Sequence, residues 1–307
     1  MQKSMSIEDN RDIIRMRRKK KVRSVITGYL FVLPSFLGFA VFMLIPIIYG
    51  FYLSLTNYNG LEKCDFVGLR NYITMFSDDY FRVSLKNNIV YMVVTVPLTI
   101  IFALFLAVVI NQGIKGAGVF KAMIFFPQVC SYVAVGIVWG IIFSENGLIN
   151  SFLRSLGAQN VPIWLQSSKW ALWAIMLVAI WKQTGYFMIM LLAGLQGIPR
   201  HLYEAAEMDG AGVFAKFFKI TLPMLSSTMF MVMVLAIIGS FQVYDLIAIM
   251  TGGGPGTATN VLVFRIYQEG FKNSHFGYAS AIAYFLFLVV MILTIIQFKL
   301  QNKWVTE

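Results

Sequence analysis

The sequence predicts an all-α membrane protein with six transmembrane helices, both chain termini in the cytoplasm and a patterned cytoplasmic loop between the fourth and fifth helices. Hydrophobic residues make up 58% of the chain and charged residues only 13%, against about 25% charged residues in soluble domains. Six apolar segments each reach the ~20 residues that cross a bilayer core. Basic residues are concentrated in alternate loops, as the positive-inside rule requires.

The amino end is the most basic part of the chain. Eight basic residues and one acid, Asp12, lie between Arg11 and Arg23. Their position beside an apolar run indicates a cytoplasmic end rather than a nucleic-acid surface, because no aromatic residues are interleaved with a basic face. The charge-free run 24–61 is far longer than the apolar core of a secretory signal, so we expect this end to be retained. We therefore predict a basic cytoplasmic segment, residues 1–24, and a six-helix transmembrane domain, residues 25–307.

The predicted spans contain residues that bend helices or let them pack closely. Pro34 and Pro46 lie in the first span and kink it, which a bundle tolerates where neighbours satisfy the freed backbone groups. Gly136 and Gly140 are four residues apart in the third span, which allows close helix packing. The six predicted spans are residues 27–53, 89–110, 122–143, 170–195, 224–250 and 278–298.

The charges of the loops set the orientation. Threading six spans through a bilayer places every strongly basic group on one side, which we expect to be cytoplasmic. These groups are Arg11 to Arg23, Lys115 with Lys121, Arg200 with Lys216 and Lys219, and Lys299 with Lys303. The opposite loops hold mixed charges, among them Glu62, Lys63, Asp65, Asp78, Asp79 and Glu145.

Residues suited to metal or nucleotide chemistry are scarce. Cys64 and Cys130 have no zinc-ligand spacing, and one lies in a loop and the other in a predicted span, so no disulfide is expected. The two histidines, His201 and His275, fall in loops on opposite sides. The glycine-rich stretch 251–259 lacks the Gly-Lys-Ser/Thr ending of a phosphate loop. We therefore expect no metal, no bound cofactor and no enzymatic activity on this chain.

The loop between the fourth and fifth spans mixes charges of both signs with helical periodicity. Apolar residues of 202–208 fall on one side of a short predicted helix, and Gly210 then permits a backbone turn. Apolar residues of 213–220 recur at helical spacing, with Lys216 and Lys219 on the other side. Two short helices joined at a glycine predict a docking element. The alternative is an amphipathic pair lying in the lipid interface.

The order of residues in this loop resembles the EAA loop of binding-protein-dependent ABC importer permeases. Glu-Ala-Ala is followed after three residues by Gly210, after nine more by Ile220 and then by Leu-Pro. The resemblance implies that the loop fits a cleft on a cytosolic ATPase subunit and transmits its motion. The ATPase-coupling residues that it implies are Glu204, Ala205, Ala206, Asp209, Gly210, Ile220, Leu222 and Pro223.

Three more stretches are similar to features of this family, the first to one of its sugar-type members and the other two to those of the maltose and glycerol-3-phosphate type permeases, so that the resemblance covers most of residues 27–303. They are Phe66-Val-Gly-Leu-Arg-Asn-Tyr72, Met250-Thr-Gly-Gly-Gly-Pro255 and Phe276-Gly-Tyr-Ala-Ser-Ala281. The resemblance implies a bacterial cytoplasmic membrane protein with a second homologous permease subunit as its heterodimer partner. It also implies an extracytoplasmic solute-binding protein and two cytosolic ATPase subunits that hold ATP and Mg²⁺, with no nucleic acid.

Polar residues inside predicted spans are candidates for substrate contacts, because ionisable groups at membrane depth are costly. Lys182 lies near the middle of the fourth span, and Asp245 lies toward the outer end of the fifth. Amides, hydroxyls and aromatic faces suit a sugar. The alternative is that these groups bond only between helices. The predicted substrate-binding residues are Lys182, Gln183, Tyr186, Ser240, Gln242, Tyr244 and Asp245. We expect Asp245 to serve an external gate, with pairing to Lys182 as the alternative.

These observations predict the membrane subunit of an ATP-driven ABC importer that passes a sugar or oligosaccharide from an external binding protein into the cytoplasm. Within that class, glycerol-3-phosphate or a polyol is the alternative substrate. An ion-coupled transporter or channel would leave the loop 204–223 unexplained, and proton-coupled carriers normally bury several carboxylates where this chain has only Asp245. A membrane enzyme is disfavoured, because the sequence offers no nucleophile–base pair.

Overall fold

The computed structural model describes residues 7–61 and 64–301, and the regular elements in those ranges are all helices. One isolated antiparallel bridge joins Thr56 and Phe66. Two compact units are present, residues 1–53 and 54–307. The boundary at residue 24, inferred from charge, stays a prediction. Three charges used for the predicted orientation, Glu62, Lys63 and Lys303, lie outside the described residues.

The described part of the first unit, from residue 7 on, is one helical run that contains the predicted span 27–53. A π-helical turn interrupts it just before Pro46, which has no N–H to donate to the carbonyl of Phe42. Residues 24–54 are long and apolar enough to cross a membrane, and large side chains such as Phe31 are exposed. The elements are α1 (Ile7–Phe39), η1 (Ala40–Leu44) and α2 (Ile45–Ser54).

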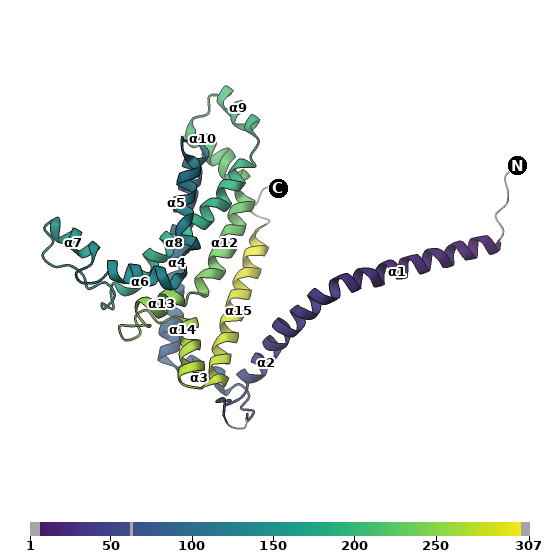
Figure 1. Cartoon of the computed structure of the whole chain (residues 1–307), viewed down its shortest axis with the longest axis horizontal. Helices are drawn as coiled ribbons and strands as arrows, with labels where there is room; N and C mark the ends of the chain where they lie inside the picture. The colour runs from purple at the N-terminus through teal and green to yellow at the C-terminus, as the bar shows by residue number, and fades with distance from the viewer. Residues whose placement is uncertain (1–6, 62–63, 302–307) are drawn as a thin grey trace. The chain divides into compact units, whose positions relative to one another are not determined.

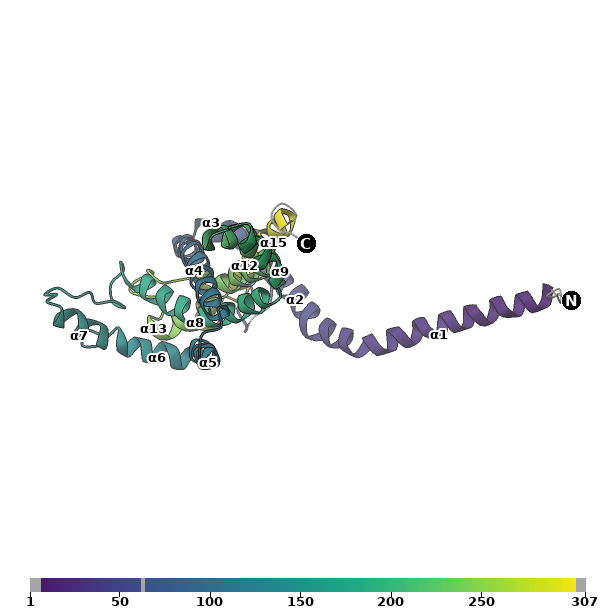
Figure 2. The same cartoon turned by 90° about the horizontal axis from the view of Figure 1, so that it is seen from above.

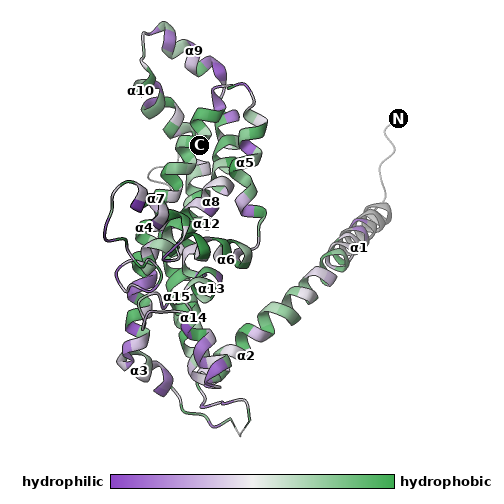
Figure 3. Ribbon diagram, turned by 60° about the vertical axis from the view of Figure 1, so that its left-hand side comes forward, coloured by the Kyte–Doolittle hydropathy of each residue, from purple (hydrophilic) through white to green (hydrophobic). Residues whose placement is uncertain are grey.

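Three continuous helices of the second unit correspond to predicted spans 89–110, 170–195 and 278–298. Each is long and apolar enough to cross a membrane, and Figure 3 shows a mainly hydrophobic bundle with hydrophilic residues gathered toward its two ends. Asp78 caps the first of them by accepting a hydrogen bond from the backbone N–H of Tyr80 at 2.9 Å. The helices are α4 (Asp79–Asn111), α8 (Ala171–Gln196) and α15 (Phe276–Gln301).

The other two predicted spans of this unit are interrupted. Span 122–143 is divided by a 98° bend between α5 (Ala117–Val129) and α6 (Tyr132–Ile142). Span 224–250 is divided at residues 242–244, between α12 (Ser226–Phe241) and α13 (Asp245–Met250). A second bend, of 67°, separates the segment Val213–Met224 from α12. Counting each bent pair as one span gives six candidate spans in the part of the chain that the structure describes.

Helix α8 is the centre of the second unit. It contacts α4, α5, α12 and α13, and in both cartoon views it lies between α6 and α15 (Figure 1 and Figure 2). Its first half packs in an apolar core with α6 and α13, and its second half in a core with α4 and α12. A Cβ on Gly136 would lie 2.9 Å from Ile249 Cγ2, which confirms that this glycine permits close packing. Gly140 has no such neighbour.

The two ends of this unit differ. One end carries two short helices, α9 and α10, and the other carries α3 and the start of α15 (Figure 1). At the α3 end, Arg265 Nη2 lies 3.1 Å from Asp78 Oδ2 and 2.8 Å from Glu269 Oε1. The Tyr278 hydroxyl donates to Asp78 Oδ2 at 2.7 Å, so a partly buried ion network joins the start of α4 to α14 and α15. The elements here are α3 (Arg70–Ser77), α14 (Leu262–Tyr267) and η3 (Gln268–Lys272). The short helix α7 (Leu148–Ser155) lies away from this end, beyond α6 (Figure 1).

Candidate functional site

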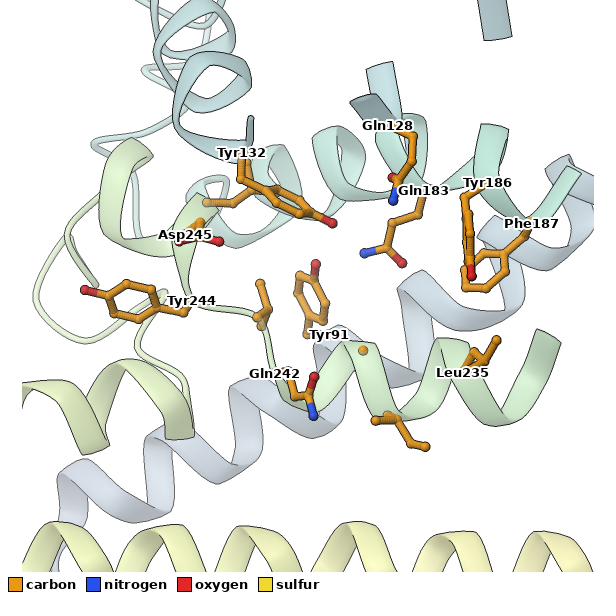
Figure 4. A pocket seen from close by; sticks show the side chains of 14 residues that line it. Tyr91, Gln128, Tyr132, Gln183, Tyr186, Phe187, Leu235, Gln242, Tyr244 and Asp245 are labelled. Carbon is orange, nitrogen blue, oxygen red and sulfur yellow. The ribbon is translucent and has the colours of Figure 1, made fainter. Parts of the chain in front are cut away.

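A cavity of about 380 Å³ lies where the two interrupted helices meet α4 and α8, a size usual for small-molecule sites. The α5–α6 break contributes Gln128 and Tyr132, and the α12–α13 break contributes residues 242–245. Figure 4 shows Gln128 and Tyr132 of the first break turned toward Gln183 and Tyr91 of the two continuous helices, whereas the Tyr244 ring of the second break points away from them. The lining residues are Tyr91, Gln128, Tyr132, Gln183, Tyr186, Phe187, Leu235, Ile238, Gly239, Gln242, Val243, Tyr244, Asp245 and Leu246.

Five of the seven predicted substrate-binding residues line this cavity. They are Gln183, Tyr186, Gln242, Tyr244 and Asp245. The first two come from α8, and the others come from the break between α12 and α13. The remaining two predicted residues, Lys182 and Ser240, do not line it.

Lys182 is buried against the end of α5 instead. Its Nζ donates to the backbone oxygens of Pro127 at 2.7 Å, Gln128 at 3.3 Å and Cys130 at 2.6 Å. The ammonium also lies 4.4 Å from the ring centre of Tyr132, and the residue is 1% exposed. The last carbonyls of a helix have no partner within the helix, and at membrane depth no water is present to satisfy them. Lys182 therefore holds the α5–α6 break rather than lining the cavity.

Ser240 has a similar local role. Its hydroxyl donates to the carbonyl of Ile237 at 2.7 Å, and its own carbonyl accepts from Asn88 Nδ2 at 3.2 Å. Asn88 is fully buried on α4, and its Oδ1 accepts from the backbone N–H of Leu262 at 3.0 Å. Thus Asn88 supports the end of α12 as Lys182 supports the end of α5. Thr184, beside the predicted set, also bonds within its helix, donating to Ile180 at 2.6 Å.

Three polar lining residues were not predicted from the sequence. Tyr91 is 1% exposed, and its hydroxyl has no hydrogen-bond partner among the described residues. The Oε1 atom of Gln128 is buried and unpaired in the same way, and Tyr132 completes the set. Buried polar atoms in native structures normally have a partner, so these two atoms mark a place for a ligand or water.

A signal for the α4 contribution was present in the sequence. Asn88, Tyr91, Thr95 and Thr99 recur at spacings of three and four residues, which places them on one side of a helix. All four are buried. A polar stripe on an otherwise apolar span indicates a side that faces the bundle interior.

The predicted coupling loop has the form that its pattern indicates. α9 (Arg200–Met208) and α10 (Val213–Lys216) are joined at Gly210, whose φ of +76° confirms the expected positive φ. Lys216 Nζ lies 2.6 Å from Glu207 Oε1 and ties the two arms together. The chain continues through η2 (Phe217–Thr221) and α11 (Leu222–Met224) into α12.

The outer surface of this helix pair is available for contacts. Large apolar side chains are exposed on it, namely Met208, Val213 and Phe214, and Phe218 of the following η2 is exposed as well. Of the predicted coupling residues, Glu204, Ala205, Asp209 and Gly210 are exposed, and Ala206, Ile220, Leu222 and Pro223 are partly buried.

Comparison with known proteins identifies the family. Residues 88–306 match the family described as binding-protein-dependent transport system inner membrane component. The chain is 36% identical to the trehalose/maltose transport system permease protein MalF of Thermococcus litoralis, over 92% of this chain and 95% of that protein. It is 34% identical to the sn-glycerol-3-phosphate transport system permease protein UgpA of Yersinia enterocolitica, over 90% and 94%.

A solved structure shares the fold. It is a bacterial alginate ABC transporter in complex with an alginate pentasaccharide-bound periplasmic protein, one chain of which gives a TM-score of 0.82 at 22% identity, covering 92% of this chain and 96% of that chain. The fold, the length of the match and the sequence identities agree. This chain therefore belongs to the family of binding-protein-dependent transport system inner membrane components, as a multi-pass permease of the bacterial cytoplasmic membrane.

Proposed function

We propose that this chain is one of two permease subunits of an ATP-driven importer and that its cavity passes a sugar or oligosaccharide. The main support is the lining, in which amides and phenols surround a space with an unpaired buried hydroxyl on Tyr91. Sugars offer hydroxyls to such groups and C–H faces to aromatic rings. The trehalose/maltose permease MalF among its relatives supports the same substrate class.

The partners follow from the same proposal. An extracytoplasmic solute-binding protein delivers the sugar, as the periplasmic protein bound to the alginate transporter of similar fold suggests. A second homologous permease completes the membrane domain, and two cytosolic ATPase subunits supply ATP hydrolysis. The pair α9–α10 contacts one ATPase through its exposed apolar surface, with Glu204 toward a basic group there.

The connections of the helix pair suggest how motion reaches the cavity. α8 leads into α9, and α11 leads into α12. A displacement of α9–α10 is therefore delivered to the helix that carries Gln183 and to the helix that ends at Gln242. Opening and closing of a site between rigid helices is the movement that alternating access needs.

In this proposal, both termini and α9–α10 face the cytoplasm, and the α3 end faces outward. Asp79 and Lys219 are exposed at these two ends. Single cysteines at these positions, in a background without Cys64 and Cys130, should react with an impermeant thiol reagent from opposite sides of sealed vesicles. Reaction from the same side would contradict the orientation.

The function is tested by reconstituting the complete transporter with its binding protein in proteoliposomes. We expect uptake of labelled sugar to require ATP and the binding protein, and to fall in Gln183→Ala while basal ATP hydrolysis is kept. Gln196→Ala, at the exposed end of the same helix, is the matched control and should transport normally. Uptake driven by an ion gradient without ATP would refute the proposal in favour of a secondary transporter.

A further inference from the structure

The cavity carries one formal charge, and it is negative. Its lining includes Asp245 but no lysine, arginine or histidine. Asp245 begins α13 at one side of the cavity, beside Tyr132 (Figure 4). Its side chain is exposed and makes no ion pair with any residue that the structure describes.

Lys182 is the cationic residue closest in sequence to the lining residues, and its ammonium group already has hydrogen-bond partners. An ammonium group has three donors, and Lys182 directs its Nζ at three carbonyls of the α5 end. Those carbonyls form the negative end of the helix dipole, which favours a cation there. Lys182 is therefore balanced locally and has no donor left for a ligand.

We infer that this cavity selects neutral saccharides over anionic ones and that Asp245 is the specificity-determining residue. The inference rests on the proposed function and narrows its substrate class. A carboxylate on the cavity wall repels an anionic ligand, and the cavity offers no arginine or lysine to replace the water that such a ligand loses. The same carboxylate accepts strong hydrogen bonds from sugar hydroxyls.

Sequence identity to the relatives does not tell whether the substrate of this chain is neutral or anionic. The relative at 36% identity is named for trehalose and maltose, which are neutral, and the relative at 34% is named for sn-glycerol-3-phosphate, an anion. The alginate of the structural relatives is an acidic polysaccharide. The lining of this chain's own cavity, with one carboxylate and no cationic side chain, is the observation from which we infer a neutral sugar.

The electrostatic potential of the cavity can be measured directly. A single cysteine, Gln242→Cys, is introduced into the assembled transporter with Cys64 and Cys130 replaced by serine. Its reaction rates with cationic trimethylammonioethyl and anionic sulfonatoethyl methanethiosulfonates are compared, each normalised to the rate with free 2-mercaptoethanol. We expect the normalised cation-to-anion ratio to exceed that of Leu61→Cys, a site 92% exposed, by about tenfold.

Two substitutions of the carboxylate make this measurement decisive. Asp245→Asn should bring the ratio at Gln242→Cys down to that of Leu61→Cys, and Asp245→Glu should keep it high. A ratio that is the same at both cysteines, or one that Asp245→Asn leaves unchanged, would overturn the inference. The cation-to-anion reaction ratio does not depend on transport, so it can be measured even if the transporter carries no sugar.

Uptake by the reconstituted transporter provides a second test of the inference. The probes are a neutral disaccharide and the uronic acid obtained by oxidising its terminal hydroxymethyl group. We expect the wild type to prefer the neutral probe, and Asp245→Asn to raise the acid-to-neutral uptake ratio by about tenfold. A wild type that prefers the acid would overturn this inference and leave the proposed function standing. ATP-independent uptake of both probes would instead refute the proposed function.

Discussion

Lys182 Nζ donates to the backbone oxygen of Cys130 over 2.6 Å, at the residue that caps the end of α5. Asn88 makes the corresponding bond to Ser240 at the end of α12. Each interrupted helix of the cavity is thus held by a buried polar side chain from a continuous helix. On α8, Gln183 directly follows Lys182. On α4, Tyr91 lies three residues after Asn88. The positions of the cavity groups therefore depend on these two contacts.

Replacing Lys182 by methionine should destabilise the protein. The change leaves buried carbonyls without partners, and we expect the free energy of unfolding to fall by about 2–4 kcal/mol. Lys169→Met, at an exposed lysine just before α8, is the control and should change it little. Thermal unfolding in detergent measures both. Equal midpoints for the two variants would show that the α5–α6 break is held by other contacts.

Replacing Tyr91 by phenylalanine should weaken substrate binding without lowering the stability of the protein. The hydroxyl has no partner among the described residues, so its removal should leave the thermal midpoint unchanged or slightly higher. If the hydroxyl bonds the substrate, its loss should weaken transport by about 1–3 kcal/mol, seen as a higher KM for uptake. Normal uptake by Tyr91→Phe would place the substrate away from this group.

The turn at Gly210 should tolerate asparagine but not valine. Its φ is +76° and nothing lies within 4 Å of a Cβ built there, so the cost of a side chain is set by backbone conformation. Asparagine accepts this region and β-branched residues do not. Gly210→Val should lower uptake and substrate-stimulated ATP hydrolysis together while the permease still inserts.

Gly212, with φ of −69° and an equally open surrounding, supplies the matched control for that series. Gly212→Val should support both activities. Normal coupling in Gly210→Val would remove the loop from the coupling mechanism.

Acid should weaken the ion network at the α3 end. Burial acts to raise the pKa of Asp78, but hydrogen bonds from Tyr278 and the Tyr80 N–H, together with the charge of Arg265, lower it overall. A carboxylate with a lowered pKa stabilises the fold above its unfolded pKa, about 3.9, and that stability is lost as pH falls through the folded value. Asp78→Asn should therefore be less stable than the wild type at pH 7.

The difference in thermal midpoint between Asp78→Asn and the wild type should shrink as pH is lowered below about 4. Asp79→Asn, at a carboxylate whose side chain is 87% exposed, is the control. A difference that stays constant from pH 7 to pH 3 would show that the Asp78 charge does not contribute.

Long uniform helices and the jointed loop were predictable from the sequence, but the interruptions were not. α4, α8 and α15 follow from sustained hydrophobicity, and Gly210 marks a turn between two periodic segments. The breaks at 130–131 and 242–244 lie inside mainly apolar segments, so the averaged hydropathy stays high across them. Lys182 and Gln183 are adjacent and at one depth, but successive residues point to different sides of a helix. Which of them faces the cavity depends on the rotation of α8, which packing sets.

The most direct test locates the sugar on the chain. A diazirine derivative of a sugar that the reconstituted transporter takes up is bound to the complete transporter with a non-hydrolysable ATP analogue, and it is photolysed there. Labelled peptides are then mapped by mass spectrometry. Competition with excess unlabelled sugar controls for random labelling. We predict competed adducts at residues 183–186 of α8 and at residues 242–245. Competed adducts elsewhere, with none at these two segments, would contradict passage of the substrate between the helix interruptions.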